Sequence, residues 1–267
     1  SPDDVNYEDY NIFNPIVIDN TGIWRDHENL SKHIKCGASK VILTAPAKGQ
    51  IKNIVYGIND SIINKDDSII SAASCTTNAI VPVLKVLDDK FGIVNGHIET
   101  VHAYTNDQNL IDNFHKKNRR GRGVPLNMVI TSTGAVNAVA KALPNLKGKL
   151  TGNAIRVPTP NVSLAIMSLL VDTCVNVDEV NNYLRSIAFH SEYREIIGYV
   201  NSPEIVSTDF YSSPFASVID SQATIVNDNR ITIYCWYDNE YGYSKQVIGL
   251  TKKVAGIHLP RLPKPIS

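Results

Sequence analysis

Residues 71–80, Ser-Ala-Ala-Ser-Cys-Thr-Thr-Asn-Ala-Ile, combine residue types that could do chemistry. An apolar run leads into this small polar cluster and a second apolar run follows it, a pattern that predicts a strand, a tight turn and a helix. Cys75 then lies at or just outside the helix N-terminus, where unpaired N–H groups and the positive end of the helix dipole favour a thiolate over a thiol. We therefore predict that Cys75 is a nucleophile.

The other three cysteines have no such surroundings. Cys36, Cys174 and Cys235 are interpreted as small buried hydrophobic residues, the usual role of a single cysteine. Cys75 differs because Ser, Thr and Asn flank it, and these residues cap helices and cradle anions. Four scattered cysteines without a Cys-x-x-Cys pair predict neither a disulfide framework nor a zinc site, and no other metal site is predicted.

Ser-Cys-Thr-Thr-Asn at residues 74–78 closely resembles the active-site segment of phosphorylating glyceraldehyde-3-phosphate dehydrogenases. Together with later motifs, the resemblance extends from about Asp19 to about Leu250. It implies an oxidoreductase of glycolysis or gluconeogenesis with NAD or NADP as cofactor. Such an enzyme converts glyceraldehyde 3-phosphate and inorganic phosphate to 1,3-bisphosphoglycerate through a thioester, here on Cys75.

His102 follows Cys75 by twenty-seven residues, within Thr-Val-His-Ala-Tyr-Thr. A single histidine on a strand is usually a satisfied core or surface residue, and the spacing alone does not pair it with Cys75. The resemblance implies that His102 is the catalytic base, because the family's motif has a catalytic histidine here. A Cys–His pair is the minimal arrangement for an activated thiol.

Several short motifs resemble the two anion pockets of the family, although each is unremarkable alone. The resemblance implies that the attacking inorganic phosphate is bound by Ser74, Thr76, Thr133 and Gly134. It implies that the substrate's own phosphate is bound by Thr105, Asp107 and Arg156, with Arg120 contributing from a basic trio. Hydroxyls, backbone N–H groups and planar guanidiniums suit a dianionic phosphate.

The elements before Cys75 predict part of a parallel sheet. Apolar strands at 15–18 and 40–44 flank a short helix at 28–36, a strand–helix–strand pattern, and runs at 54–58 and 68–70 are predicted as further strands. Thr21, Gly22 and Thr44 follow the first two strands, at the edge where ligands bind in such sheets, and are predicted to contact the cofactor. This is the C-terminal part of a Rossmann-type sheet.

The chain contains no Gly-x-Gly-x-x-Gly fingerprint, and no acidic residue about 20 positions beyond one to hold an adenosine ribose. In the resembled family that fingerprint opens the protein, so we expect the first half of the dinucleotide-binding domain to be absent. This expectation leaves NAD and NADP both open. It also raises the alternative of a truncated, inactive remnant that binds no cofactor.

The residues after Cys75 predict an α+β domain with a mainly antiparallel sheet. Strands are predicted at 97–105 and 163–171, helices at 136–143 and 177–190, and a hairpin around Asn227-Asp228-Asn229. A helix at 243–254 precedes a Pro-rich tail. The predicted domains are residues 1–75, the remainder of the dinucleotide-binding domain, 76–240, the catalytic domain, and 241–267, a helix and tail that return to the nucleotide domain.

Asn239 lies in Trp-Tyr-Asp-Asn-Glu-Tyr-Gly-Tyr-Ser, which resembles the family segment that holds the nicotinamide carboxamide, so the resemblance implies that Asn239 binds the cofactor. The alternative is a polar turn after a strand. Two positions depart from the family: Tyr241 replaces an expected threonine, and Asn113-Phe114 replaces the Leu-Pro typical of NAD-preferring members.

Composition restricts the partners. Lys and Arg total 26 and Asp and Glu total 26, so charge predicts neither a nucleic-acid nor a membrane partner, and no apolar run reaches the length of a membrane span. The cysteines favour a reducing cytoplasm. The resemblance implies a homotetramer with residues 105–126 at a subunit interface. An erythrose-4-phosphate dehydrogenase is a close alternative. A cofactor-free thiol hydrolase, from another class, is disfavoured because no third orienting residue is identifiable and two phosphate pockets would be superfluous.

Overall fold

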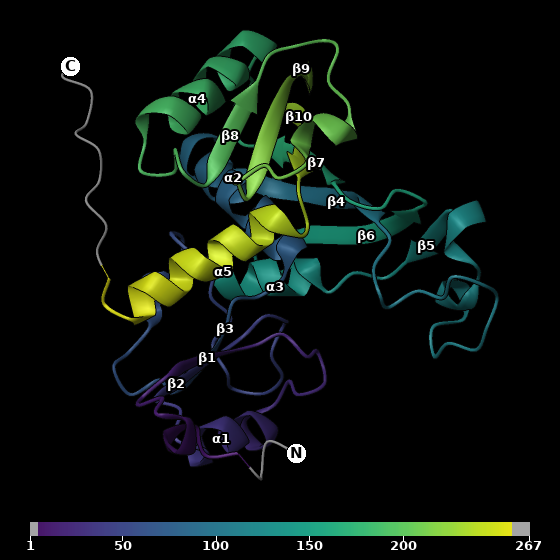
Figure 1. Ribbon diagram of the computed structural model, residues 1–267. Coiled ribbons are helices and arrows are strands. Elements are labelled where there is room, and N and C mark those ends of the chain that lie inside the picture. The colour runs from purple at the N-terminus through teal and green to yellow at the C-terminus, as the bar shows by residue number, and fades with distance from the viewer. Residues whose placement is uncertain (1–4, 258–267) are drawn as a thin grey trace. The chain divides into compact units, whose positions relative to one another are not determined.

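The computed structural model describes residues 5–257, which form two compact units. The first unit contains the chain up to Ser74 and the chain from Gln246 onward, and the second contains Cys75–Lys245 (Figure 1). The first unit has a parallel strand–helix pattern, and the second has mainly long antiparallel strands. None of the helices within residues 5–257 has the length and apolarity to cross a bilayer.

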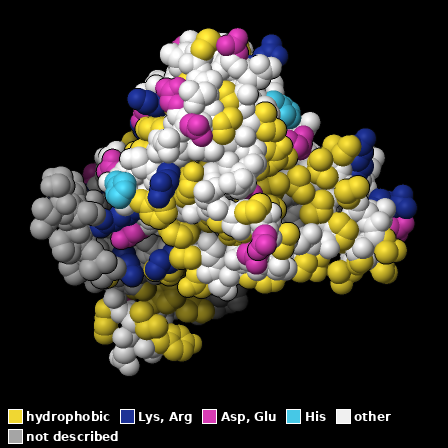
Figure 2. Space-filling view, turned by 90° about the horizontal axis from the view of Figure 1, so that it is seen from above, with side chains coloured by type: hydrophobic (Ala, Val, Ile, Leu, Met, Phe, Trp, Pro, Cys, Tyr) yellow, Lys and Arg dark blue, Asp and Glu magenta, His cyan; other side chains and the backbone are white. Residues whose placement is uncertain are grey.

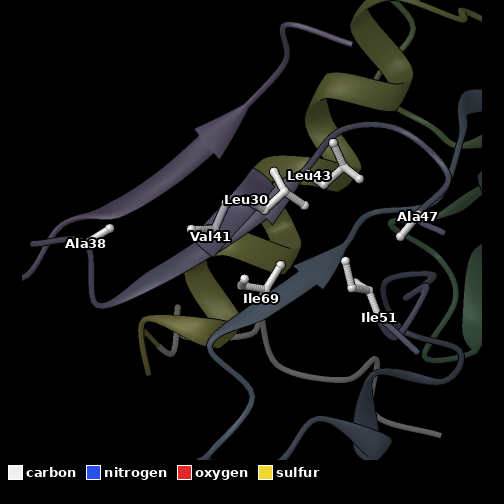
Figure 3. Packing of buried hydrophobic residues seen from close by; sticks show 7 residues of the cluster. All are labelled: Leu30, Ala38, Val41, Leu43, Ala47, Ile51 and Ile69. Atoms are coloured by element: carbon white, nitrogen blue, oxygen red, sulfur yellow. The ribbon is translucent and has the colours of Figure 1, made fainter. Parts of the chain in front are cut away.

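The first unit is built on a three-stranded parallel sheet. Its elements are β1 (Ile16–Asp19), α1 (His27–Lys35), β2 (Lys40–Leu43) and β3 (Ile69–Ser71), with strand order β1-β2-β3. α1 begins at its N-cap Asp26, whose side chain accepts from the amide of Asn29. Figure 3 shows the core of the sheet, formed by buried side chains of Leu30, Ala38, Val41, Leu43, Ala47, Ile51 and Ile69.

The predicted strand at 54–58 is wrong. Beyond an isolated bridge between Asn53 and Ser71, this segment turns instead of pairing, and the turn leads into a 3-10 helix at Asp60–Ile62. The Asn59 side chain accepts from the amide of Val55, and Gly57 has a φ of +77°, which strand residues do not adopt. An apolar composition alone does not distinguish a buried turn from a buried strand.

The second unit is built on a seven-stranded mixed sheet of order β5-β6-β4-β7-β10-β9-β8. Its strands are β4 (Ile93–Ala103), β5 (Val129–Thr131), β6 (Leu150–Val157), β7 (Ser163–Val171), β8 (Ile197–Val200), β9 (Ser217–Asn227) and β10 (Arg230–Tyr237). β4 is parallel to β6 and β8 is parallel to β9, whereas the other pairs are antiparallel. The two units together confirm the predicted fold class.

Three helices of the second unit, α2 (Cys75–Phe91), α3 (Ala135–Ala142) and α4 (Val177–His190), pack against the sheet, and Figure 1 shows α4 alongside β8 and β9. Buried and less buried residues alternate along the central strands, and in β10 the buried ones are Ile231, Ile233, Cys235 and Tyr237. The intervening residues are only half-buried. The predicted hairpin is confirmed, with Asp228 at a φ of +63° in its turn.

The last helix, α5 (Tyr241–Val254), starts in the second unit and ends in the first. The buried carboxylate of Asp238 accepts from the amides of Glu240 and Tyr241, and so satisfies the N–H groups at the helix start. At the other end Lys253 pairs with Asp60 at 2.7 Å. The predicted Pro-rich tail lies beyond the described residues.

Candidate active site

Cys75 is the first residue of α2 and follows a strained turn. After β3 the chain reverses at Ala73, whose φ is +57°, a left-handed conformation that is uncommon for a residue with a Cβ. The amide of Ala73 donates to Ser71 Oγ at 3.0 Å, which holds the turn. Strained backbone of this kind often accompanies functional sites, and here it presents a half-buried thiol at a helix N-terminus.

His102 lies near the end of β4 and is 4% exposed. Its Nε2 is 3.6 Å from Sγ of Cys75, so the structure brings together the two residues that the sequence spacing alone did not pair. On the other side of the ring, Nδ1 lies 2.6 Å from the carbonyl oxygen of Ala103. When Nδ1–H donates to this carbonyl, Nε2 is the acceptor that faces the thiol.

The ionisation of the pair differs from the expected thiolate. Burial raises the pKa of the Cys75 thiol, and the opposing effects of Thr76 and Arg156 are smaller. Burial also lowers the pKa of His102 to about 3, with a further lowering by the charges of Arg156 and Arg120. At neutral pH the site therefore holds a neutral thiol beside a neutral imidazole, which can take the thiol proton.

Two arginines lie next to this pair. Arg156, on β6, donates from Nη1 to the carbonyl of Ala103 at 2.9 Å, and the same atom lies 2.5 Å from Nδ1 of His102. Arg120 is 9% exposed; its Nε donates to Oγ1 of Thr131 at 3.0 Å. Burial lowers the pKa of both guanidiniums, and the charge of Arg156 further lowers that of Arg120. Arg156 acts on the thiol and Arg120 on the imidazole, and two such partly desolvated cations make an environment suited to an anion.

We expect the Arg156→Leu variant to raise the pKa of the Cys75 thiol by about one pH unit, because a neighbouring cation stabilises the thiolate. The rate of alkylation by iodoacetamide, measured against pH, gives this pKa. The matched control is Arg185→Leu, which removes an exposed arginine on α4 and leaves the profile unchanged. An unchanged profile in Arg156→Leu would contradict the electrostatic role of this residue.

The remaining predicted anion-binding residues fall into separate groups. Asp107 forms an ion pair with Arg120, and Thr105 lies two residues before it. Thr133 and Gly134 immediately precede α3, where Oγ1 of Thr133 accepts from the amide of Ala135, and α3 packs on α2. Two further residues flank the thiol in sequence, Ser74 and Thr76. Oγ1 of Thr76 lies 4.0 Å from Sγ of Cys75.

Tyr237 is a site residue that the sequence analysis did not assign. It is 1% exposed, and its hydroxyl lies 3.0 Å from Oγ1 of Thr76. Its ring meets the ring of His102 edge to face, with centroids 5.9 Å apart. The alternation of apolar residues along β10 could have revealed it, because Tyr237 lies on the same face of the strand as the buried residues Ile233 and Cys235.

We expect Tyr237→Phe to reduce stability by about 1 kcal/mol, because the buried Oγ1 of Thr76 loses its hydrogen bond to the Tyr237 hydroxyl. The free energy of unfolding from urea titration measures this loss. Tyr234→Phe is the matched control, since Tyr234 lies on the opposite face of the same strand and is only half-buried. Equal losses in the two variants would show that the hydroxyl of Tyr237 has no special role.

The predicted cofactor residues belong to both units. In the first unit Thr21 and Gly22 follow β1, Thr44 follows β2, and the amide of Thr44 donates to the carbonyl of Asp19 at 2.9 Å. In the second unit Asn239 is buried, and its Oδ1 accepts from Oγ of Ser163 at 2.8 Å. That Ser163 hydroxyl oxygen also accepts from the amide of Ala103, so Asn239 is tied to the strand that carries His102.

None of the four cysteines forms a disulfide within the described residues, and Cys36 and Cys235 are buried as predicted. The prediction is wrong for Cys174, which is exposed because it lies in the loop after β7. No group of three His, Cys, Asp or Glu side chains within residues 5–257 is arranged to hold a metal ion.

Comparison with known proteins gives the family. Residues 74–239 match the model of the glyceraldehyde 3-phosphate dehydrogenase C-terminal domain. The chain is 61% identical over 264 residues to a glyceraldehyde-3-phosphate dehydrogenase-like protein of Pseudomonas aeruginosa. This match covers 98% of this chain and 57% of that protein. It is 49% identical to a chloroplastic glyceraldehyde-3-phosphate dehydrogenase of Arabidopsis thaliana, over 90% of this chain and 60% of the relative.

A glyceraldehyde-3-phosphate dehydrogenase of Zymomonas mobilis is 43% identical over 90% of this chain and 72% of its own length. The chain thus spans less than two thirds of the Pseudomonas and Arabidopsis relatives, and the match includes both the Cys75 segment and the His102 strand. The chain belongs to the glyceraldehyde-3-phosphate dehydrogenase family of oxidoreductases.

Proposed function

We propose that this protein oxidises glyceraldehyde 3-phosphate with NAD or NADP and inorganic phosphate, and releases 1,3-bisphosphoglycerate in glycolysis or gluconeogenesis. The observation that carries the proposal is the 3.6 Å contact between the Cys75 thiol and the His102 imidazole beside two arginines, in a member of this family. A thiol and a base supply covalent catalysis, and the arginines suit phosphorylated reactants.

The proposed reaction proceeds on Cys75. Nε2 of His102 takes the thiol proton, and the sulfur attacks the aldehyde carbon to give a hemithioacetal, whose oxygen the backbone N–H at the start of α2 can stabilise. A nicotinamide held by Thr21, Gly22, Thr44 and Asn239 would accept the hydride from the hemithioacetal carbon, and a thioester would remain on the sulfur. An oxygen of inorganic phosphate then attacks the thioester carbon, the C–S bond breaks, and the acyl phosphate leaves. The thioester conserves the oxidation energy that hydrolysis would release.

We assign the substrate's phosphate to Arg156, Arg120, Thr105 and Asp107. Nε of Arg156 is buried without a hydrogen-bond partner within the described protein, as expected of a group that a ligand would satisfy. The Asp107 carboxylate would act on this phosphate indirectly, because its ion pair with Arg120 orients the guanidinium. The attacking phosphate is assigned to Ser74, Thr76, Thr133 and Gly134, three hydroxyls and the backbone at the start of α3.

For the cofactor, the residues present fit a dinucleotide. Gly22 has a φ of +71° and nothing within 4 Å of the position of a Cβ, so its backbone is open to a ligand. Thr21 and Thr44 lie at the carboxyl ends of adjacent parallel strands, where such sheets bind nucleotides. We propose that these three residues and Asn239 would hold NAD or NADP.

The test is formation of the reduced nicotinamide by the purified protein, with aldehyde, cofactor and phosphate each omitted in turn. We expect the rate to depend on all three, and glyceraldehyde 3-phosphate to be preferred over erythrose 4-phosphate. Turnover independent of phosphate would overturn the acyl-phosphate mechanism. If calorimetry detects no micromolar binding of either dinucleotide, the protein is instead an inactive remnant or an assembly subunit.

We further propose assembly into a homotetramer through an exposed apolar surface, here named the 110–130 surface. Figure 2 shows hydrophobic side chains gathered on the right of the view, the side on which Figure 1 places β5. The surface comprises the exposed residues Leu110, Ile111, Phe114, Leu126, Met128 and Ile130. Phe114 and Leu126 are each 90% exposed, and monomers rarely leave such patches uncovered.

We expect Leu126→Asp to weaken self-association at least about tenfold, because a buried unpaired charge at an interface is unfavourable. Sedimentation velocity over a range of protein concentrations measures the effect. Phe189→Asp on α4, with Phe189 51% exposed and outside the 110–130 surface, is the control that retains assembly. Equal dissociation in both variants would contradict this interface. A cytoplasmic location is also proposed, because four cysteines without a disulfide in the described residues suit a reducing compartment.

A further inference from the structure

A chain of hydrogen bonds in the first unit ends at the turn that carries Thr21. The carboxylate of Asp19, at the end of β1, has no exposed side-chain surface. Its Oδ1 accepts from the amide of Thr21 at 2.9 Å and from the Thr21 hydroxyl at 2.8 Å. Its Oδ2 lies 3.3 Å from Nε2 of His33, on α1. The Thr21 hydroxyl oxygen in turn accepts from the amide of Ile23 at 3.3 Å.

The chain continues on the far side of the imidazole. Nδ1 of His33 is 3.1 Å from the hydroxyl of Tyr7, which lies in the 3-10 helix Tyr7–Tyr10. Because Asp19 can only accept, Nε2 of a neutral His33 carries the proton and Nδ1 accepts from Tyr7. Trp24 packs edge-on against the imidazole with ring centroids 5.4 Å apart, which fixes the ring plane. The donors then converge on the Asp19 carboxylate, with Tyr7 and His33 on the Oδ2 side and Thr21 on the Oδ1 side.

We infer that Tyr7, His33 and Asp19 form a positioning relay that fixes the Thr21–Gly22 turn in its ligand-binding conformation. None of the three contacts the cofactor in this assignment. They act through Thr21, whose amide and hydroxyl are both bound by Asp19, and through Thr44, which donates to the Asp19 carbonyl from its amide and hydroxyl. That the ligand is a dinucleotide rests on the proposed function.

The geometry favours positioning over stability alone. A buried carboxylate needs donors, and Thr21 already supplies two on Oδ1. His33 adds a donor on Oδ2, so the carboxylate is held from both sides and its plane is fixed. Without His33 the carboxylate can rotate about its Cβ–Cγ bond, and the turn that depends on Oδ1 loses its single orientation.

His33→Leu tests the relay, because leucine fills the space without offering a donor or an acceptor. We expect about tenfold faster hydrogen exchange of the Thr21 amide by NMR and about tenfold weaker binding of NAD by calorimetry. If the protein turns over, KM for the cofactor rises and kcat is unchanged. His33→Gln should restore both values in large part, since glutamine can donate to Asp19 and accept from Tyr7. The control is His27→Leu, an exposed position on the same helix.

The outcomes separate the relay from the proposed function. Unchanged exchange of the Thr21 amide in His33→Leu overturns the relay, whether or not the protein binds NAD. Faster exchange with unchanged NAD affinity overturns its link to the cofactor. Faster exchange in the variant, together with no NAD binding by the unaltered protein, supports the relay as the device that sets the turn and rejects the dehydrogenase. Equal losses in the Leu and Gln variants reduce His33 to a packing residue.

Discussion

Replacing Cys75 by alanine is expected to abolish aldehyde-dependent formation of the reduced nicotinamide, with kcat lower by at least about 10⁴-fold. The loss is this large because the proposed hemithioacetal and thioester both form on this sulfur. His102 and Thr76 contact Sγ, and neither an imidazole nor a threonine hydroxyl replaces a thiol in this chemistry. Steady-state rates with saturating aldehyde and phosphate measure the loss.

Two further variants sharpen this test. Cys174→Ala removes an exposed thiol and is expected to leave the rate unchanged. Cys75→Ser keeps a hydrogen-bonding group near Nε2 of His102 but offers a far weaker nucleophile, so it should retain cofactor binding without turnover. Mass spectrometry after mixing with aldehyde and cofactor, without phosphate, should find an acyl adduct on Cys75. Turnover by Cys75→Ala would contradict the covalent mechanism.

The sequence predicts those parts of the site that depend on local chemistry. The polar cluster around Cys75 interrupts two apolar runs, and the helix begins at this residue. The helix at 177–190 and the strand at 163–171 have the predicted bounds, because their periodicities are long and uninterrupted. The placement of His102 beside Cys75 depends on a strand that is distant in sequence, and only resemblance supplied it.

What the sequence did not predict depends on long-range packing. Tyr237 contacts Thr76 across 161 positions, and His33 reaches Asp19 from another element. The uncharged state of the Cys75–His102 pair follows from burial, which no local motif encodes. The helix N-terminus favours a thiolate, but desolvation by the surrounding protein opposes this effect. Apolar composition also gave a wrong strand prediction at residues 54–58, where the structure has a buried turn.

Replacing His102 by glutamine is expected to have the second largest effect, because it removes the base and changes how stability depends on pH. The variant should lower kcat by about 10²–10⁴-fold, the usual contribution of a general base. It should also remove the loss of stability that the unaltered protein shows as the pH falls. In the folded protein the pKa of His102 is lowered to about 3, whereas an unfolded histidine has its ordinary value of about 6.5.

Between these two pKa values His102 is protonated in the unfolded chain but not in the folded protein. The free energy of unfolding therefore falls as the pH falls below about 6.5. From pH 6.5 to pH 5 the loss attributable to His102 is about 1.6 kcal/mol. This is less than the limiting slope of about 1.4 kcal/mol per pH unit would give, because the unfolded histidine is only half protonated at pH 6.5. Urea titrations at both pH values should show this loss in the unaltered protein and in His190→Gln, an exposed control, but not in His102→Gln. The same pH slope in all three proteins would mean that His102 is not held neutral by its burial, and the neutral-pair description of the site would then be wrong.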